Sequence, residues 1–188
     1  GRIRIGQTHS AQFGAGASSN RDLDGNEKTG PLFDLAFRRD SRHINYRLQY
    51  NVIDPNFDTS TGFVRRVDTR RLDADIEYVW WPESWIINWG PRFSYLRNDD
   101  HTGVLQDEDF RANINMRFSR NIFFRIDGRR ELERYRNINF FKTRFSLRNS
   151  INTDRRVSLF YGLDWGDQIR FIDNPFLGRF FEYNIGAT

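Results

Sequence analysis

The sequence predicts an all-β protein: an antiparallel up-and-down meander of about ten strands that is part of a transmembrane β-barrel. Three observations indicate this fold class. Apolar and polar residues alternate in one segment after another, no segment shows a helical period, and the connections are alternately long and short. In residues 62–81, GFVRRVDTRRLDADIEYVWW, the alternation gives one apolar strand face and one charged face that carries Asp73, Asp75 and Glu77.

Taken in order, the strands are expected at residues 2–17 (Gly- and Ala-rich, with weak alternation), 32–38, 44–52, 72–81, 85–97, 110–118, 122–133, 141–152, 157–165 and 181–187. The short connections follow Arg38, Trp81, Phe118 and Asn152, and the long ones follow Ala17, Val52, Arg97, Glu133 and Trp165. A meander places alternate connections at opposite ends of its sheet. The connections at one end of the sheet are therefore expected to be short turns and those at the other end long loops, as in outer-membrane barrels.

Composition narrows the class of protein. Aromatic residues make up 16% of the 188 residues, yet the mean hydropathy is −0.74. Of 29 basic residues only Lys28 and Lys142 are lysines, and 25 acidic residues leave a net charge of +4. Mixed charge argues against a nucleic-acid surface, and the absence of cysteine excludes disulfides and thiolate metal sites. We interpret residues 1–188 as a single barrel segment cut from a longer chain, because both ends have strand-like sequence.

Alternation alone does not say whether the apolar face contacts lipid or a protein core, and a soluble all-β module has the same period. Strands of ten or more residues are long for a sandwich. Aromatic residues gather near strand ends, as in the girdles of membrane barrels, at Trp80, Trp81, Trp85, Tyr95 and Trp165. We therefore expect the polar faces to line a lumen, with Arg47, Asp73, Asp75, Glu77, Arg92, Arg111, Arg117, Arg125, Arg144 and Arg148 as the lining residues.

Residues 54–72, DPNFDTSTGFVRRVDTRRL, resemble a motif of a Gram-negative family. In that family a carbohydrate-binding domain similar to family-nine modules precedes a barrel-like domain of unknown function. The motif has an Asn/Pro loop, then Gly-Phe-Val, then Arg, Asp and Arg before a strand. Here the pattern falls on Asn56, Gly62, Phe63, Val64, Arg66, Asp68 and Arg71, followed by a Trp-rich turn at residues 80–85. It covers about a tenth of the chain, and its Asn56-to-Gly62 spacing is longer than the common form. The resemblance implies an outer-membrane location and a role in glycan binding or uptake; it supplies no catalytic residues.

The same loop is the candidate binding motif, with Gly62, Phe63, Arg65, Arg66, Asp68, Arg70 and Arg71 as its residues. Its paired arginines suit either lipopolysaccharide phosphates or acidic residues of the lumen, and the sequence does not separate the two.

Catalytic chemistry is weakly indicated. The segment Asn98–His101 contains the Asp and His types of some outer-membrane proteases, but Asp-rich loop tips are ordinary turns, and two carboxylates fall short of a calcium site. Asp73, Asp75 and Glu77 have a spacing that a glycosidase tolerates, but acids in strands more often pair with arginine.

The hypothesis is therefore a segment of a porin-like protein of the bacterial outer membrane, non-enzymatic, with a transport or surface glycan-related role. Its expected partners are outer-membrane lipid, lipopolysaccharide and glycans, with no nucleic acid, cofactor or metal. The alternative is a soluble all-β carbohydrate-binding module whose aromatic residues form a core and a sugar-stacking surface.

Overall fold

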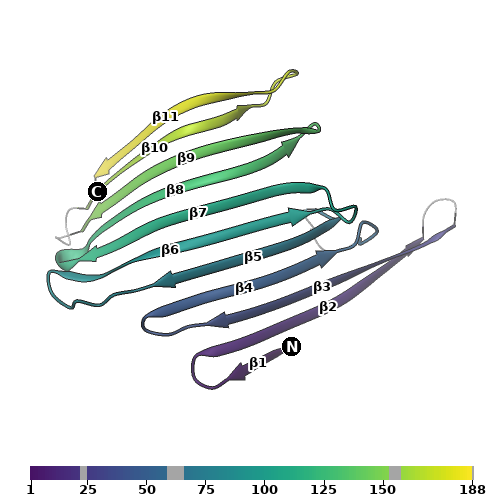
Figure 1. Cartoon of the computed structure of the whole chain (residues 1–188), viewed down its shortest axis with the longest axis horizontal. Helices are drawn as coiled ribbons and strands as arrows, with labels where there is room; N and C mark the ends of the chain where they lie inside the picture. Colours follow the sequence, from purple (N-terminus) through teal and green to yellow (C-terminus); the bar gives the residue numbers. More distant parts are fainter. Residues whose placement is uncertain (22–24, 59–65, 153–157, 188) are drawn as a thin grey trace.

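The computed structural model describes residues 1–21, 25–58, 66–152 and 158–187. They form eleven strands and one short 3-10 turn (Figure 1). The strands are β1 (Arg2–Ile5), β2 (His9–Arg21), β3 (Glu27–Arg39), β4 (Ile44–Ile53), β5 (Thr69–Tyr78), β6 (Ile86–Asp99), β7 (Leu105–Phe118), β8 (Ile122–Tyr135), β9 (Ile138–Ile151), β10 (Leu159–Arg170) and β11 (Phe176–Ala187).

All eleven strands lie in one antiparallel sheet in chain order, which confirms the all-β meander. The sheet is open: β1 forms one edge and β11 the other, and the described residues do not pair these two strands. Apart from β1, each strand has 10–14 residues.

The first predicted strand is in fact two strands. Gly6, with a φ of +63°, lies in the tight turn between β1 and β2. Glycine accepts this left-handed conformation without a Cβ clash, so the chain reverses inside a stretch that alternates only weakly.

The expected alternation of long and short connections is wrong. Going by the bounds of the described strands, the connection between β4 and β5, residues 54–68, is the one long connection, because the supposed loops at 18–30 and 166–178 are largely strand. In the first of these, Ser19 pairs with Thr29 and Asn20 with Lys28. Backbone pairing does not require apolar side chains, so these polar residues extend the hairpin beyond the pattern that predicts it.

The connection expected near residues 134–139 is a two-residue turn. Arg136 and Asn137 have φ of 48° and 63°, and Tyr135 pairs with Ile138 on either side of them. Two consecutive positive φ values make the kind of turn that fits the twist of adjacent strands.

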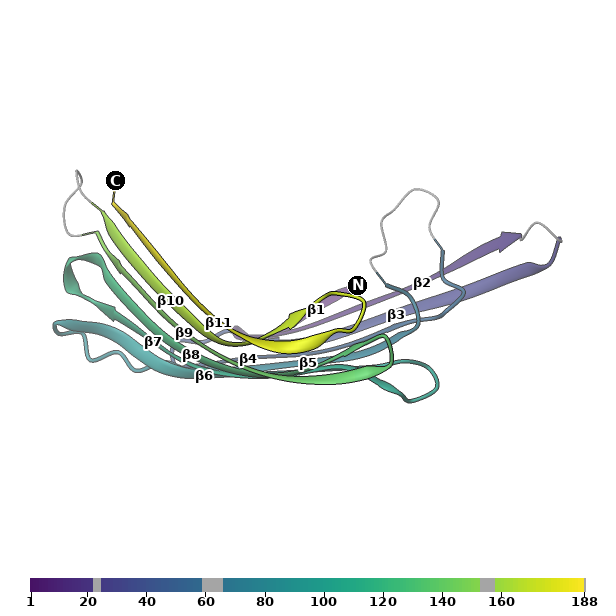
Figure 2. The same ribbon diagram turned by 90° about the horizontal axis from the view of Figure 1, so that it is seen from above.

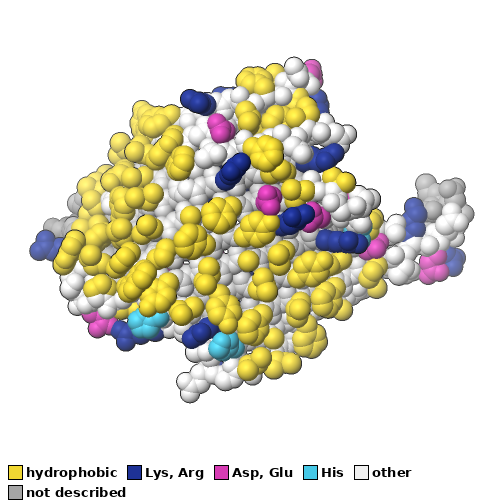
Figure 3. All heavy atoms as spheres, viewed as in Figure 1, with side chains coloured by type: hydrophobic (Ala, Val, Ile, Leu, Met, Phe, Trp, Pro, Cys, Tyr) yellow, Lys and Arg dark blue, Asp and Glu magenta, His cyan; other side chains and the backbone are white. Residues whose placement is uncertain are grey.

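The sheet curves into a trough, as Figure 2 shows. Apolar side chains cover much of its outer, convex face (Figure 3), and strand alternation directs the charged side chains to the concave face. Only Leu132, Phe140 and Ile169 are buried hydrophobic residues among those described. The accessible surface is 13159 Å², against about 9,500 Å² for a compact monomer of this mass. The chain is therefore one curved layer with almost no core of its own.

One glycine is required where two strands approach closely. A Cβ on Gly90 of β6 would overlap the carbonyl oxygen of Tyr78 at the end of β5. Next to it, Trp80 and Trp89 form a β-bridge and stack with their ring centroids 4.6 Å apart. The absence of a side chain at Gly90 thus lets the two strands approach closely enough for Trp80 and Trp89 to stack.

Candidate functional site: the charged concave face

The ten residues expected to line a lumen share one face of the sheet. Strand pairing puts Arg47 opposite Asp75, Glu77 opposite Arg92, and Arg125 opposite Arg148. Along a strand, residues two apart point the same way, and this relation adds the remaining members: Asp73, Arg111, Arg117 and Arg144. The structure therefore brings this whole set to the concave face.

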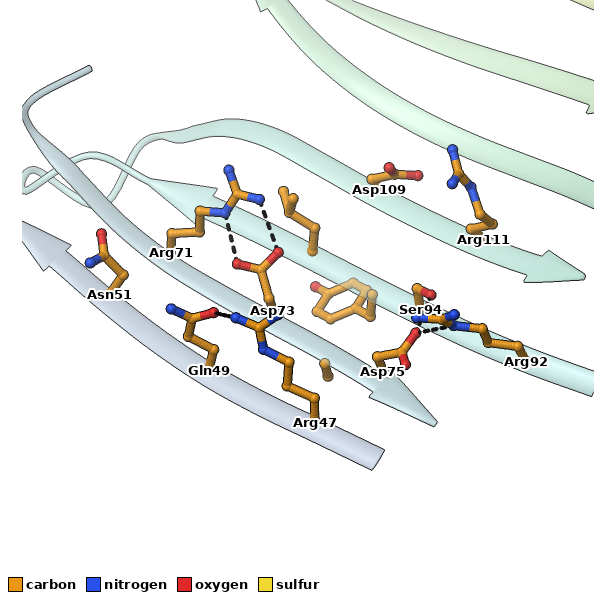
Figure 4. Close-up of a pocket in the computed structure, with 13 residues that line it drawn as sticks. Arg47, Gln49, Asn51, Arg71, Asp73, Asp75, Arg92, Ser94, Asp109 and Arg111 are labelled. Atoms are coloured by element: carbon orange, nitrogen blue, oxygen red, sulfur yellow. Dashed lines mark hydrogen bonds and ion pairs between the residues drawn. The ribbon is translucent and has the colours of Figure 1, made fainter. Parts of the chain in front are cut away.

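A hollow of about 580 Å³ lies on this face over β4–β7; we call it the central hollow (Figure 4). Its acids are held by arginines. Asp73 accepts two hydrogen bonds from Arg71, at 2.7 and 3.0 Å. Asp75 accepts one from Arg92 at 2.7 Å and one from Ser94 at 2.7 Å. These acids therefore have the arginine partners that the sequence predicts, an arrangement that suits structural pairing better than catalysis.

A second hollow, of about 650 Å³, lies toward the β4–β5 connection; we call it the loop-end hollow. Its lining acids are Asp107, Glu108, Asp109, Glu131 and Glu133, and its lining arginines are Arg66, Arg71, Arg129 and Arg134. Among them, Arg129 lies 2.6 Å from Asp109.

Lys142 is a buried cation beside this hollow. Its side chain is 3% exposed, and its Nζ lies 3.1 Å from Glu131 and also contacts Glu133. Burial of an ammonium is costly unless carboxylates compensate it, and here two do. Sequence reasoning did not single out Lys142. Its being one of only two lysines in the chain was the available signal.

A third hollow, of about 470 Å³, lies over β7–β11; we call it the β9 hollow. Here the arginines are in excess, with Arg111, Arg125, Arg129, Arg144 and Arg148 facing Asp127, Asp164 and Glu182. The concave face therefore changes from a hollow whose five acids are matched by four arginines and Lys142 at the loop end to an arginine-rich hollow over β9.

The loop motif is divided between several places. Gly62, Phe63 and Arg65 lie outside the described residues. Arg66 donates to Asp107 at 2.8 Å and to Gln106 at 3.0 Å. Asp68 accepts from the backbone N–H of His101 at 2.9 Å, and its Oδ1 lies 2.8 Å from Nδ1 of that histidine. Of the two candidate arginines in β5, Arg71 is on the concave face and Arg70, by alternation, is on the other. The structure thus does not gather this motif into one site.

His101 and Asp100 lie at the loop tip between β6 and β7. Asp100 accepts from the Thr102 hydroxyl at 2.6 Å and from the Val104 backbone N–H at 2.9 Å. These hydrogen bonds lower the pKa of the Asp100 carboxyl below its ordinary value of 3.8. Asp100 is thus committed to closing the turn. The contact of His101 with Asp68 could not be inferred from the sequence, because the two residues lie on separate connections.

On the convex face, the apolar side chains form a band with different residue types at its two ends. Along β7 its apolar residues run from Phe110 to Phe118, about 27 Å at a strand rise of 3.4 Å. Toward the loop end, Arg97 pairs across the strands with Glu108 and forms an ion pair of 2.8 Å with Asp99.

Toward the other end lies an aromatic cluster in which Trp85 stacks on Phe118 and Tyr78 is tilted against Trp80. The centroid distances are 4.4 Å for Tyr78–Trp80 and 5.4 Å for Trp85–Phe118. The indole N–H of Trp81 donates to the carbonyl of Arg42 at 2.8 Å. An apolar band is therefore framed by charges at one end and by amphipathic rings at the other.

Within the described parts of the chain, no group of three or more His, Asp or Glu residues is arranged to hold a metal ion. None of the described segments is a helix with the length and hydropathy needed to cross a bilayer. No protein-family model, curated protein or solved structure matches this chain, so the fold and the concave face stand on the geometry alone.

Proposed function

We propose that the chain forms part of the wall of a β-barrel in the outer membrane of a Gram-negative bacterium. The convex face contacts lipid and the concave face lines an aqueous lumen. The role is non-enzymatic and porin-like: transport of a solute or a surface glycan-related function.

The carrying observation is that large apolar side chains are exposed on the convex face of a layer that has only three buried hydrophobic residues in its described parts. In water these apolar side chains would stay exposed to solvent, which is unfavourable, because no second layer of the described structure covers the face. In a bilayer, lipid tails cover it. Apart from β1, the strands of 10–14 residues are also long enough for the roughly 9–11 that a tilted membrane strand requires.

Two further features support the lipid-facing orientation. At the tilt of about 35–45° usual in membrane barrels, the apolar band of about 27 Å along β7 rises about 19–22 Å, close to the ~25 Å height of the lipid-contacting band. Tryptophan and tyrosine favour the bilayer interface, where an apolar ring and a polar N–H or O–H are both accommodated. The aromatic cluster around Trp80 and Trp85 fits that setting.

The alternative is a soluble carbohydrate-binding module with an aromatic core. A core of that kind buries its aromatic rings, whereas Trp85 is 67% exposed and Phe181 68% exposed. The alternative therefore needs a second layer to cover the convex face. It remains the competing outcome of the experiment below.

Protease accessibility in intact cells tests the proposal. A cleavage site inserted after Thr59, in the long connection, is compared with a matched site inserted after Glu83, in the β5–β6 connection at the opposite end of the sheet. We expect external protease to cut one site and spare the other, and to cut both once the outer membrane is permeabilised. Protection of both sites in intact cells, with the protein in the soluble periplasmic fraction, would contradict the membrane role and favour the soluble module.

A further inference from the structure

The β9 hollow holds like charges in direct cross-strand contact. Pairing places Arg111 opposite Arg129, and Arg129 opposite Arg144, in one row across β7, β8 and β9. A second row places Arg125 opposite Arg148. Like charges directly opposite one another in a sheet are destabilising, so two such rows require compensation.

The row between them supplies only part of that compensation. It contains Asp127, Ser146 and Asp164 as successive cross-strand partners. Asp127 is shared, lying 3.3 Å from Arg125 and 3.6 Å from Arg111. Asp164 is held by Arg148 at 2.6 Å. The middle position of the row, Ser146, carries no charge.

Ser146 is therefore a neutral position between the carboxylates of Asp127 and Asp164 in its own row, with arginine rows on either side. Arg144 and Arg148 precede and follow it by two residues on the same face of β9, about 7 Å away. The Ser146 hydroxyl forms no hydrogen bond with any residue in the described ranges.

The arginines keep donors available for a ligand. The Nε of Arg111 is shielded from solvent and has no hydrogen-bond partner among the described residues. Arg144 donates through its Nε to the carbonyl of Asp167 at 3.0 Å, and its guanidinium lies 5.7 Å from the ring centre of Phe180. Arg129 is assigned to Asp109 and Glu131, and Glu131 also lies 3.7 Å from Arg144; the other four arginines that line the hollow face three lining carboxylates.

We propose that the β9 hollow binds an oxyanion over Ser146, in the form of the carboxylate, sulfate or phosphate group of the solute that the lumen admits. The guanidinium forks donate to the anion in pairs, as arginine does to carboxylate and phosphate, and the Ser146 hydroxyl donates a further hydrogen bond. At about 470 Å³ the hollow also leaves room for a sugar ring attached to the anionic group. The inference rests on the proposed function, because it names the solute class of that same lumen.

Binding of two probes to the purified full-length protein in detergent, at low ionic strength, tests the site. The probes are inorganic phosphate and galacturonate, with galactose as the uncharged match for galacturonate. We expect saturable binding of at least one anion by calorimetry and none of galactose. Because screening weakens charge-assisted contacts, binding is expected to fall as salt is raised.

Ser146→Asp places a carboxylate at this neutral position and is expected to weaken anion binding at least about tenfold. Asn51→Asp is the matched control: Asn51 lies on the concave face in β4, opposite Arg71 and outside the β9 hollow, and this variant is expected to bind as the wild type does. Arg148→Gln is the second variant, used if Ser146→Asp does not fold, and it is expected to weaken binding similarly.

Galacturonate binding without phosphate binding identifies a sugar acid as the ligand, and the reverse identifies a free inorganic oxyanion; either supports the site. No saturable binding by the wild type, or equal binding by the Ser146 and Asn51 variants, overturns it. The cell-surface protease experiment reports on the barrel separately. If the protein is found in the soluble fraction and still binds the anion, the anion site is supported and only the membrane role is contradicted.

Discussion

The Nδ1 of His101 lies 2.8 Å from Oδ1 of Asp68, although 33 residues separate them, and the His101 backbone N–H donates to the same oxygen. Two connections at one end of the sheet, 54–68 and 100–104, are thereby joined.

Asp68→Ala is expected to free the β6–β7 connection. It removes the acceptor of the His101 N–H and puts alanine at a φ of 57°, which asparagine and aspartate tolerate better. We expect the loss of one hydrogen bond, about 1 kcal/mol of local stability. Hydrogen exchange at the His101 amide measures it, and Asp68→Asn is the control that keeps both the acceptor and the backbone preference. Equal exchange in the two variants would show that the contact does not hold the connection.

The Asp100 turn is expected to weaken in acid. The folded-state pKa of Asp100 is lowered, so its contribution to stability is fully present above the ordinary value of 3.8 and is lost as pH falls through the lowered folded value. The expected result is faster exchange of the Val104 amide below pH 3.8, with little change above it. Asp100→Asn is expected to remove this pH dependence; if the variant keeps the same profile, another group is responsible.

Gly90→Ala is expected to destabilise the fold strongly, although it adds only one methyl group. The added Cβ overlaps the carbonyl oxygen of Tyr78, and backbone is less able to move aside than a flexible side chain. We expect a loss of at least about 2 kcal/mol, measured by urea unfolding of the detergent-folded protein. Gly16→Ala is the matched control, since Gly16 also lies within a strand and has open space at its Cβ. A similar loss in both variants would mean that the crowding at Gly90 is not the cause.

Placing an arginine on the convex face tests whether that face contacts lipid or water. Ile114 and Ile126 are cross-strand partners that are 38% and 45% exposed. Ile114→Arg is expected to cost about 2–4 kcal/mol in a bilayer, where an arginine near the midplane is unfavourable. Leu159→Arg is the depth control: Leu159, the first residue of β10, is 46% exposed and lies on the convex face at the end of its strand, so the change is expected to cost at most about 1 kcal/mol. Unfolding from phospholipid vesicles compares them. Equal small costs would contradict a lipid-facing surface.

Much of the meander was predictable because alternation in a strand is a property of the strand itself. The segments 72–81 and 110–118 show it in their sequence, and the structure contains β5 and β7 there. The same rule placed the ten lumen candidates on one face. Polar extensions such as Ser19 opposite Thr29 were missed, because their strand conformation comes from a partner across the hairpin.

The arrangement of charges into rows was not predictable. The register of Arg111, Arg129 and Arg144 depends on the lengths of two turns, and an error of one residue in either turn moves a whole strand to the opposite face. Burial of Lys142 between Glu131 and Glu133 depends on the same register. Lumen lining and the absence of catalysis stay predictions.

The unpaired edge of strand β11 affects how prone the chain is to aggregate. Its twelve residues leave one side without a partner in the described structure, and Ile185 is 78% exposed. A long edge strand with exposed apolar residues is a template for pairing with another chain, and in β11 only Arg179 and Glu182 are charged. Under the proposed membrane role, this strand is an aggregation hazard until the chain reaches a bilayer. We therefore expect the protein to need a holding chaperone in water, and this segment expressed alone to need refolding into detergent.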